Sequence, residues 1–308
     1  MAYQRNSDIS TESYRDYLSP KWWPTWMGIG VILFIGYLPA AIQIALGDFL
    51  GLLSLIQGKR RRIAARNIEL THPHLTSWQR HKLLLRSFIS MGRAITETAR
   101  AWTPRKADPS RLRVDGLEYV QQAHKDGYGV ILMGAHFCLI DICGTLLHQL
   151  VGYSVVQRKN NNPLLNLFIT KARLRYSDLL IARMDIKGML KSLKAPESVM
   201  WYAPDQDYGG KGSVFVPFCG IPTATITATS KLAKSGNAKV IPIDYERDGY
   251  NRYKVTIFPA LDIPGESLEK DAEQINQWIE SRIKVHPQDY LWVHRRFKSR
   301  PEGSPSLY

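Results

Sequence analysis

The sequence predicts an α/β fold in which a mostly parallel sheet is flanked by helices, with a membrane helix added at the N-terminus. Two patterns carry this prediction. Short apolar runs alternate with segments of helical periodicity over much of the chain, which is typical of a parallel sheet covered on both faces. Near the N-terminus, no residue from 22 to 47 is charged. The chain of 308 residues suffices for one large domain with an appendage.

These patterns divide the chain into a polar segment (1–21), a membrane-anchoring segment (22–57) and a cytoplasmic domain (58–308). At about 1.5 Å per residue, an uncharged helix of this length could cross a hydrocarbon core of roughly 30 Å, or it could lie in the membrane interface. A buried apolar core helix is the alternative to a membrane role. Three tryptophans at the start of the segment are typical of interfacial anchors. The basic run at 59–62 (KRRR) follows the segment, and positive residues tend to stay on the cytoplasmic side.

The remaining elements are predicted from apolar periodicity and from helix-ending residues. Helices are expected at 84–102, 117–125, 140–150, 164–176, 188–194, 225–235 and 268–285. Strands are expected at 130–133, 153–156, 198–202, 240–245 and 253–258, the last two as a pair.

The composition indicates anionic partners and a reducing compartment. The chain holds 41 Lys and Arg against 27 Asp and Glu, a formal net charge of +14. Such a surface attracts nucleic acid, anionic lipid or an acidic protein. No nucleic-acid-binding motif accompanies the charge, so we expect no nucleic-acid partner. Three cysteines form no disulfide framework, which favours a reducing compartment.

A histidine and an aspartate follow the strand expected at 130–133. His136 stands just after that strand, and Asp141 opens the helix expected at 140–150. Chemistry in open α/β folds gathers where strands end and helices begin. A carboxylate at this spacing can reach the ring nitrogen that does no chemistry, and would then stabilise the imidazolium. The pair predicts a general base with its partner, and a structural histidine capping the helix is the alternative.

Two further acids lie in the loop after the strand expected at 198–202. Asp205 and Asp207 stand two residues apart, without a His or Cys at ligand spacing. We therefore predict no metal site. We expect these carboxylates to bind arginines or sugar hydroxyls of a substrate, and a polar turn is the alternative.

Basic residues gather near strand ends and in the C-terminal tail. Arg158 and Lys159 follow the strand expected at 153–156, Arg173 lies on the next helix, and Arg295 and Arg296 lie in the tail. Guanidinium groups suit phosphates and carboxylates, which they can bind bidentately. Single arginines are also common as solvated surface charges. The clustering nevertheless predicts an anionic substrate.

Four stretches together resemble one enzyme family: His136-Phe137-x3-Asp141, 202–209 (YAPDQDYG), 214–218 (VFVPF) and 294–303 (HRRFKSRPEG). They look like the late acyltransferases of lipid A biosynthesis, the lauroyl and myristoyl transferases of Gram-negative bacteria. The resemblance covers nearly the whole chain and is closest to the lauroyl-type branch. Lauroyl-type members carry Glu where this chain has Asp141, which is shorter by one methylene.

The resemblance implies transfer of an acyl chain, expected to be lauroyl, from acyl carrier protein to a hydroxyl of a 3-hydroxyacyl chain on Kdo2-lipid IVA. It makes His136 the base and Asp141 its partner, without a metal or organic cofactor. Acyl carrier protein, Kdo2-lipid IVA and inner-membrane lipids are then the expected partners. Residues 58–308 would form the acyltransferase domain on the cytoplasmic face of the bacterial inner membrane.

Other functions stay open at the level of the sequence. A glycerophosphate or lysophospholipid acyltransferase would use the same base and anchor with a smaller anionic acceptor. A thioesterase would release free fatty acid without an acceptor. A membrane-bound binding protein without catalytic activity would carry the same charge, with His136 as a structural residue.

Overall fold

The computed structural model describes residues 12–308 and is built around a seven-stranded sheet. Its strands are β1 (Leu112–Asp115), β2 (Gly129–Met133), β3 (Ser154–Gln157), β4 (Leu179–Ala182), β5 (Val199–Tyr202), β8 (Ala238–Arg247) and β9 (Tyr253–Ile257). Their order across the sheet is β1-β9-β8-β2-β5-β3-β4.

Most neighbouring strands run parallel, which confirms the predicted sheet. The exception is β8 with β9, an antiparallel pair as expected for the last two strands. β2 lies at the centre, between β8 and β5. The loops that follow β2 and β5 therefore leave the same edge of the sheet side by side. The edge strands β1 and β4 were not predicted.

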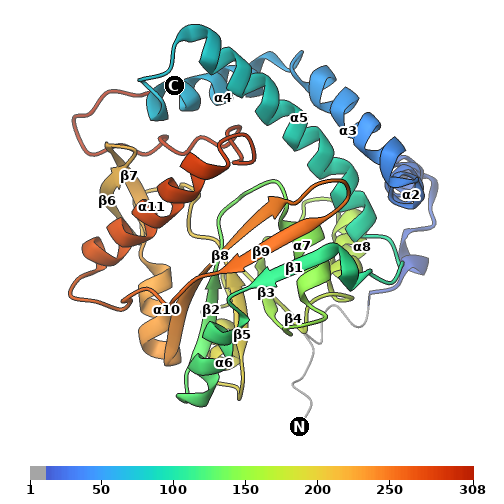
Figure 1. Cartoon of the computed structure of the whole chain (residues 1–308). Helices are drawn as coiled ribbons and strands as arrows, with labels where there is room; N and C mark the ends of the chain where they lie inside the picture. Colours follow the sequence, from blue (N-terminus) through green and yellow to red (C-terminus); the bar gives the residue numbers. More distant parts are fainter. Residues whose placement is uncertain (1–11) are drawn as a thin grey trace.

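Helices cover both faces of the sheet (Figure 1). Those that follow β1 are α6 (Leu117–Lys125), α7 (Ile140–Leu147), α8 (Pro163–Arg173), α9 (Ile186–Leu193), α10 (Ala228–Gly236) and α11 (Leu268–Val285). Successive residues of a strand point to opposite faces, so β2 divides its side chains between two cores.

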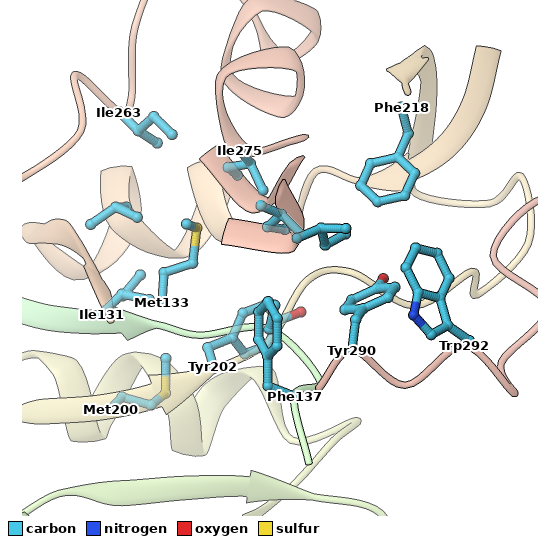
Figure 2. Close-up of a cluster of buried hydrophobic side chains, with 14 of the residues drawn as sticks. Ile131, Met133, Phe137, Met200, Tyr202, Phe218, Ile263, Ile275, Tyr290 and Trp292 are labelled. Atoms are coloured by element: carbon cyan, nitrogen blue, oxygen red, sulfur yellow. The ribbon is translucent and has the colours of Figure 1, made fainter. Parts of the chain in front are cut away.

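The two cores lie on opposite faces of β2. Ile131 and Met133 pack with α9, α10 and α11 in what we term the α11-side core. Figure 2 shows this core reaching from the sheet to Ile275 of α11 and to Trp292 of the C-terminal tail. Val130 and Leu132 pack with α6 and α7 in the α7-side core. All five residues of β2 are buried, as expected for a central parallel strand.

A two-stranded hairpin of β6 (Ser213–Phe218) and β7 (Ile221–Ile226) stands apart from the main sheet and was not predicted. Its two-residue turn places Cys219 and Gly220 at positive φ angles of 51° and 76°, the conformation that suits the twist of a tight hairpin. The helix predicted at 225–235 begins only at Ala228, because the residues before it belong to β7 and to the N-cap.

Residues 22–57 do not form the single helix that the sequence predicts. The chain forms two helices, α2 (Trp23–Tyr37) and α3 (Ala40–Ser54), separated at Leu38 and Pro39. A residue before proline favours extended backbone, and Leu38 adopts φ −60° and ψ 151°. Among residues 12–308, no single helix is long and apolar enough to cross a membrane. Only α3 and α4 (Gly58–Thr71) taken together have the length and apolar character for it, and the two helices are bent by 92° relative to each other.

The α2–α3 pair packs against the long helix α5 (Ser77–Ala101). Figure 1 shows the pair on the side of α5 away from the sheet. Gly47 and Gly51 of α3 meet Gly92 of α5, where a Cβ would overlap the backbone of both glycines. The Arg93 guanidinium pairs with the Asp48 carboxylate beside them, with Nη2 at 2.8 Å from Oδ2. Small residues thus let the two helices approach at backbone distance.

The ends of the described chain complete the fold. Short 3-10 turns are η1 (Tyr14–Tyr17), η2 (Pro20–Trp22) and η3 (Pro109–Arg111). Of the predicted polar segment 1–21, residues 1–11 lie outside the described chain. The C-terminal tail ends beside α4 (Figure 1), where Arg66 Nε donates to the Leu307 carbonyl at 3.0 Å. Asn67 Nδ2 donates to the Trp292 carbonyl at 2.6 Å.

Candidate active site

His136 lies in the loop between β2 and α7, and the C-terminal tail holds that loop. The His136 carbonyl accepts a hydrogen bond from Leu291 N at 3.0 Å, and Cys138 N donates to the Asp289 carbonyl at 2.8 Å. Phe137, between them, packs edge-on against Tyr290 (Figure 2). The loop is therefore fixed on both sides of the histidine, although the tail stands more than 150 positions away in the sequence.

Asp205, and not Asp141, is the carboxylate that pairs with His136. The Nδ1 atom of His136 lies 2.6 Å from Asp205 Oδ1, and the backbone N–H of His136 donates to Oδ2 at 3.0 Å. Asp205 follows β5, the neighbour of β2, and is 2% exposed. A buried carboxylate on Nδ1 holds the proton there and leaves Nε2 to accept one. Nε2 has no hydrogen-bond partner among residues 12–308.

The pair shifts the pKa values of both groups. Burial disfavours the charged imidazolium, but the charge and hydrogen bond of Asp205 outweigh it, so the pKa of His136 lies above its usual 6.5. Burial alone would raise the pKa of Asp205, whereas His136 lowers it to about 2. The carboxylate is thus charged throughout the physiological range and can stabilise an imidazolium.

Asp141 binds Arg173 and Tyr176 and not His136, which corrects the prediction that it orients the histidine. Its Oδ1 accepts from Tyr176 Oη at 2.8 Å and from Arg173 Nη2 at 3.2 Å. Arg173 also donates to Gln157 Oε1 at 3.2 Å. The Asp141 charge raises the pKa of Arg173. Asp141 faces α8 from the first turn of α7, and fixes a guanidinium close to the histidine loop.

Two predicted substrate-binding residues are instead structural. Asp207 accepts from the backbone N–H of Ser299 at 2.6 Å and from its hydroxyl at 2.9 Å, and its side chain is 0% exposed. Arg296 is 2% exposed and donates to the Ala224 carbonyl at 2.6 Å and to Thr225 Oγ1 at 3.0 Å. Both tie the C-terminal tail to the rest of the molecule, so neither can reach a substrate in this structure.

A cavity of about 870 Å³ opens beside His136. Of the residues predicted to bind substrate, Arg158 and Arg173 line it, and Asp141 lines it with them. Lys159 and Arg295 are exposed and are not among the described residues that line the cavity. The Arg295 guanidinium lies 5.6 Å from the centre of the Tyr308 ring.

Three cations at the cavity were not singled out from the sequence: Arg183, Lys211 and Lys231. Arg183 follows β4 directly, and it was missed because that strand was not predicted. Together with Arg158 they form what we term the basic rim. The rest of the lining is largely apolar, with Leu147, Val155 and Met189 among its members. Among residues 12–308, no group of three or more His, Cys, Asp or Glu residues could hold a metal ion.

The fold and the site together define the class of protein: an α/β enzyme whose cavity, with an apolar lining and a basic rim, lies at the carboxyl edge of a mostly parallel sheet. The comparison with known proteins narrows this class. The family model of the bacterial lipid A biosynthesis acyltransferases matches residues 11–299, and the chain belongs to that family.

Individual relatives agree over nearly their full length. The chain is 37% identical to a lipid A biosynthesis lauroyltransferase of Escherichia coli (strain K12), with 94% of this chain and 96% of that protein covered. It is 35% identical to the palmitoleoyltransferase of the same strain, with 96% and 97% covered. A lipid A biosynthesis acyltransferase of Haemophilus influenzae is 39% identical, with 95% and 96% covered. The chain is an acyltransferase of lipid A biosynthesis, as the resemblance implied.

Proposed function

We propose that this acyltransferase moves a lauroyl chain from acyl carrier protein to a hydroxyl of a 3-hydroxyacyl chain on Kdo2-lipid IVA, with His136 as general base. The observation that carries the proposal is the pairing of His136 Nδ1 with the buried Asp205 carboxylate beside an apolar cavity. The lauroyl chain is chosen because a lauroyltransferase is among the similar proteins.

In the proposed reaction, His136 Nε2 takes the proton of the acceptor hydroxyl while the hydroxyl oxygen attacks the thioester carbonyl carbon. The C–S bond of the tetrahedral intermediate then breaks. The departing sulfur takes the proton back from the imidazolium, which returns the histidine to its neutral form. Asp205 stabilises the imidazolium between these steps.

The negative oxygen of the intermediate needs hydrogen-bond donors. We assign this role to the backbone N–H groups of the first turn of α7, which have no partner inside the helix, and to the Arg173 guanidinium. Arg173 lines the cavity and is held by Asp141 at 3.2 Å. In this proposal, Asp141 acts through Arg173.

Charge and hydrophobicity support the identity of the two substrates. The basic rim suits the phosphates and carboxylates of Kdo2-lipid IVA, and the apolar lining suits acyl chains. Acyl carrier protein is acidic, and a chain with a formal net charge of +14 would attract it electrostatically.

The outer face of the α2–α3 pair supports attachment to the cytoplasmic face of the inner membrane. Large apolar side chains on both helices are exposed: Trp23, Met27, Val31, Phe34, Tyr37, Ile42, Phe49, Leu52 and Leu53. Phe34 is 67% exposed and Phe49 is 60% exposed. A contiguous apolar face of this kind usually marks an interaction surface. The basic run at 59–62 follows at once and suits anionic headgroups.

The reaction is tested with purified protein in mixed micelles containing Kdo2-lipid IVA and lauroyl-loaded acyl carrier protein, with products read by mass spectrometry. The wild type should add one lauroyl mass, and His136→Ala should lower the rate by roughly 10²–10⁴-fold, the usual share of a general base. The matched control is His148→Ala, because His148 also pairs with a carboxylate, Asp178 at 3.0 Å, but is not among the cavity-lining residues.

Each other outcome of this assay contradicts the proposal in a recognisable way. Acylation of lysophosphatidic acid in place of Kdo2-lipid IVA would identify a glycerolipid acyltransferase. Release of free fatty acid alone would identify a thioesterase. Equal rates for the wild type and His136→Ala would remove the histidine from the chemistry.

Membrane attachment is tested by flotation with vesicles of phosphatidylethanolamine and phosphatidylglycerol. The wild type should float with the vesicles. The double variant Phe34→Asp/Phe49→Asp should stay in solution, because two charges would enter the apolar face. Tyr250→Asp is the control, since Tyr250 is 66% exposed but lies in the turn between β8 and β9. Flotation of the double variant like the wild type would show that this face does not hold the membrane.

A further inference from the structure

The cavity reaches both faces of the sheet at its carboxyl edge. Val155 and Val156 are successive residues of β3, and Trp201 and Tyr202 are successive residues of β5, yet all four line the cavity. Successive strand residues point to opposite faces. Val155 and Trp201 accordingly pack with the α7-side core, whereas Val156 and Tyr202 pack with the α11-side core.

The cavity therefore has two limbs that meet at the sheet edge. We term them the α7 limb, between the sheet and α7, and the α9 limb, between the sheet and the α9–α10 side. The α7 limb is lined by Gly144, Leu147, Tyr153, Val155 and Trp201. The α9 limb is lined by Val156, Ile186, Met189, Tyr202 and Ala228.

The α7 limb leads away from the site and ends among buried side chains. α7 begins beside the site with Ile140 and ends at Leu147, and β3 runs towards the site from Tyr153. Leu147 thus lies about 9 Å along the helix from Asp141, and Tyr153 about 13 Å along the strand from Gln157. Leu147 is 2% exposed and Tyr153 is 4% exposed, so these two residues form the closed end.

A glycine sets the space at this end. A Cβ atom on Gly144 would lie 2.6 Å from the Tyr153 hydroxyl oxygen but 3.8 Å from the ring carbon that bears it. The first distance is a clash and the second is an ordinary van der Waals contact. The Tyr153 ring therefore reaches across to α7, and its hydroxyl occupies the space that Gly144 leaves free.

The α9 limb differs because it opens towards solvent and charge. Ile186 is 48% exposed, and the neighbouring cavity residue Met184 is 81% exposed. Arg183 and Lys231 of the basic rim lie on the same side, after β4 and on α10. A lipid with a charged headgroup fits this limb, whereas a closed apolar limb fits only a hydrocarbon chain.

We infer that the α7 limb holds the donor acyl chain, and that the Gly144–Tyr153 contact at its closed end sets the chain length that the enzyme transfers. The inference rests on the proposed function, and it places the acceptor lipid in the α9 limb. The donor carbonyl lies at the sheet edge beside His136, and its chain extends along α7 until it meets Leu147 and Tyr153.

The test measures kcat/KM with acyl carrier proteins loaded with C10 and C12 chains, for the wild type and for Gly144→Ala. The added methyl group should push the Tyr153 hydroxyl into the limb. The C12/C10 ratio should then fall by roughly tenfold or more, since one methylene in a fitted apolar pocket is worth about 10–200-fold. Melting temperatures of both proteins show whether the variant keeps its fold.

A double variant separates a length effect from general damage. Gly144→Ala/Tyr153→Phe lacks the hydroxyl that the new methyl group meets, so its C12/C10 ratio should return to the wild-type value. An unchanged ratio in Gly144→Ala, or a ratio that stays low in the double variant, would overturn the inference.

A substitution on the other limb tells which substrate occupies which face. Val156→Leu should raise the KM for the acceptor lipid and leave the donor ratio unchanged. A donor ratio that responds to Val156→Leu and not to Gly144→Ala would place the donor chain in the α9 limb and overturn the inference. If the wild type transfers no chain to Kdo2-lipid IVA with any donor, the proposed function itself fails, which is a distinct result.

Discussion

Asp205 and Asp141 each hold one functional group near the cavity, and they differ in which group lies within hydrogen-bond distance. Asp205 fixes His136 through Nδ1 and through the backbone N–H. Asp141 fixes Arg173, with help from Tyr176. The pKa of His136 lies above its usual 6.5. The imidazole is mostly neutral only above this raised pKa, so activity should rise with pH through it.

Arg296 and Arg158 allow the structural and substrate-binding roles of arginine to be separated. Arg296→Ala should lower the free energy of unfolding by roughly 2–4 kcal/mol, because it removes the buried hydrogen bonds to the Ala224 carbonyl and Thr225 Oγ1. Arg158→Ala should keep the melting temperature, because Arg158 is exposed at the cavity, and should raise the KM for the acceptor lipid.

Thermal melts and acceptor titrations of both variants check this contrast. A raised acceptor KM with normal stability in Arg296→Ala would restore that residue to the substrate site. A lost melting transition in Arg158→Ala would make Arg158 structural.

The contact between α3 and α5 depends on glycine. At Gly92, a Cβ would overlap the backbone of Gly47 and Gly51, which cannot move aside as a side chain could. Gly92→Ala should therefore lower the free energy of unfolding by about 1–3 kcal/mol, the usual cost of overpacking. Gly28→Ala is the matched control, because a Cβ at Gly28 of α2 meets nothing within 4 Å.

Gly28→Ala should instead stabilise α2 by roughly 0.5–1 kcal/mol, because alanine favours a helix more than glycine does. Urea unfolding of the two variants measures both effects. Equal stability of Gly92→Ala and the wild type would show that α3 can shift on α5 without loss.

The elements that could be predicted from sequence are those with a strong local pattern. The buried run of β2 and the amphipathic α11 lie where the pattern placed them. The division of 22–57 into α2 and α3 was not predicted, because the uncharged apolar pattern continues without a break across Pro39. Gln43 of α3 bridges the break in a way that no local pattern reveals: its Nε2 donates to the Ile35 carbonyl near the end of α2 at 2.8 Å.

Across the whole molecule, packing contacts, ion pairs and a hydrogen bond link the α2–α3 pair to the histidine loop. The α2–α3 pair packs on α5, and α5 is tied to β8 and to the C-terminal tail by Arg247. Arg247 pairs with Glu97 of α5 and with Asp289 of the tail, each at 2.8 Å. The carbonyl of Asp289 in turn accepts from Cys138 in the histidine loop. The loop is thus held by an ion-pair network that spans three parts of the chain.

This organisation explains which parts of the site could be predicted. His136, Asp141 and Arg173 carry local signals, because each stands at a strand exit or on the helix next to one. The partnership of His136 with Asp205 joins residues 69 positions apart. It depends on β5 lying beside β2, a strand order that no local pattern contains. The buried roles of Asp207 and Arg296 likewise depend on where the C-terminal tail packs.

The pH dependence of kcat/KM for the wild type, Asp205→Asn and Asp141→Asn tests the central claim most directly. The wild type should rise through a pKa above 6.5. Asp205→Asn should lose roughly 10²–10⁴-fold and shift its midpoint to lower pH, because the carboxylate that raises the pKa of His136 is gone. Asp141→Asn should keep the wild-type midpoint, since Asp141 acts through Arg173. A shifted midpoint in Asp141→Asn, with an unchanged profile in Asp205→Asn, would contradict the account.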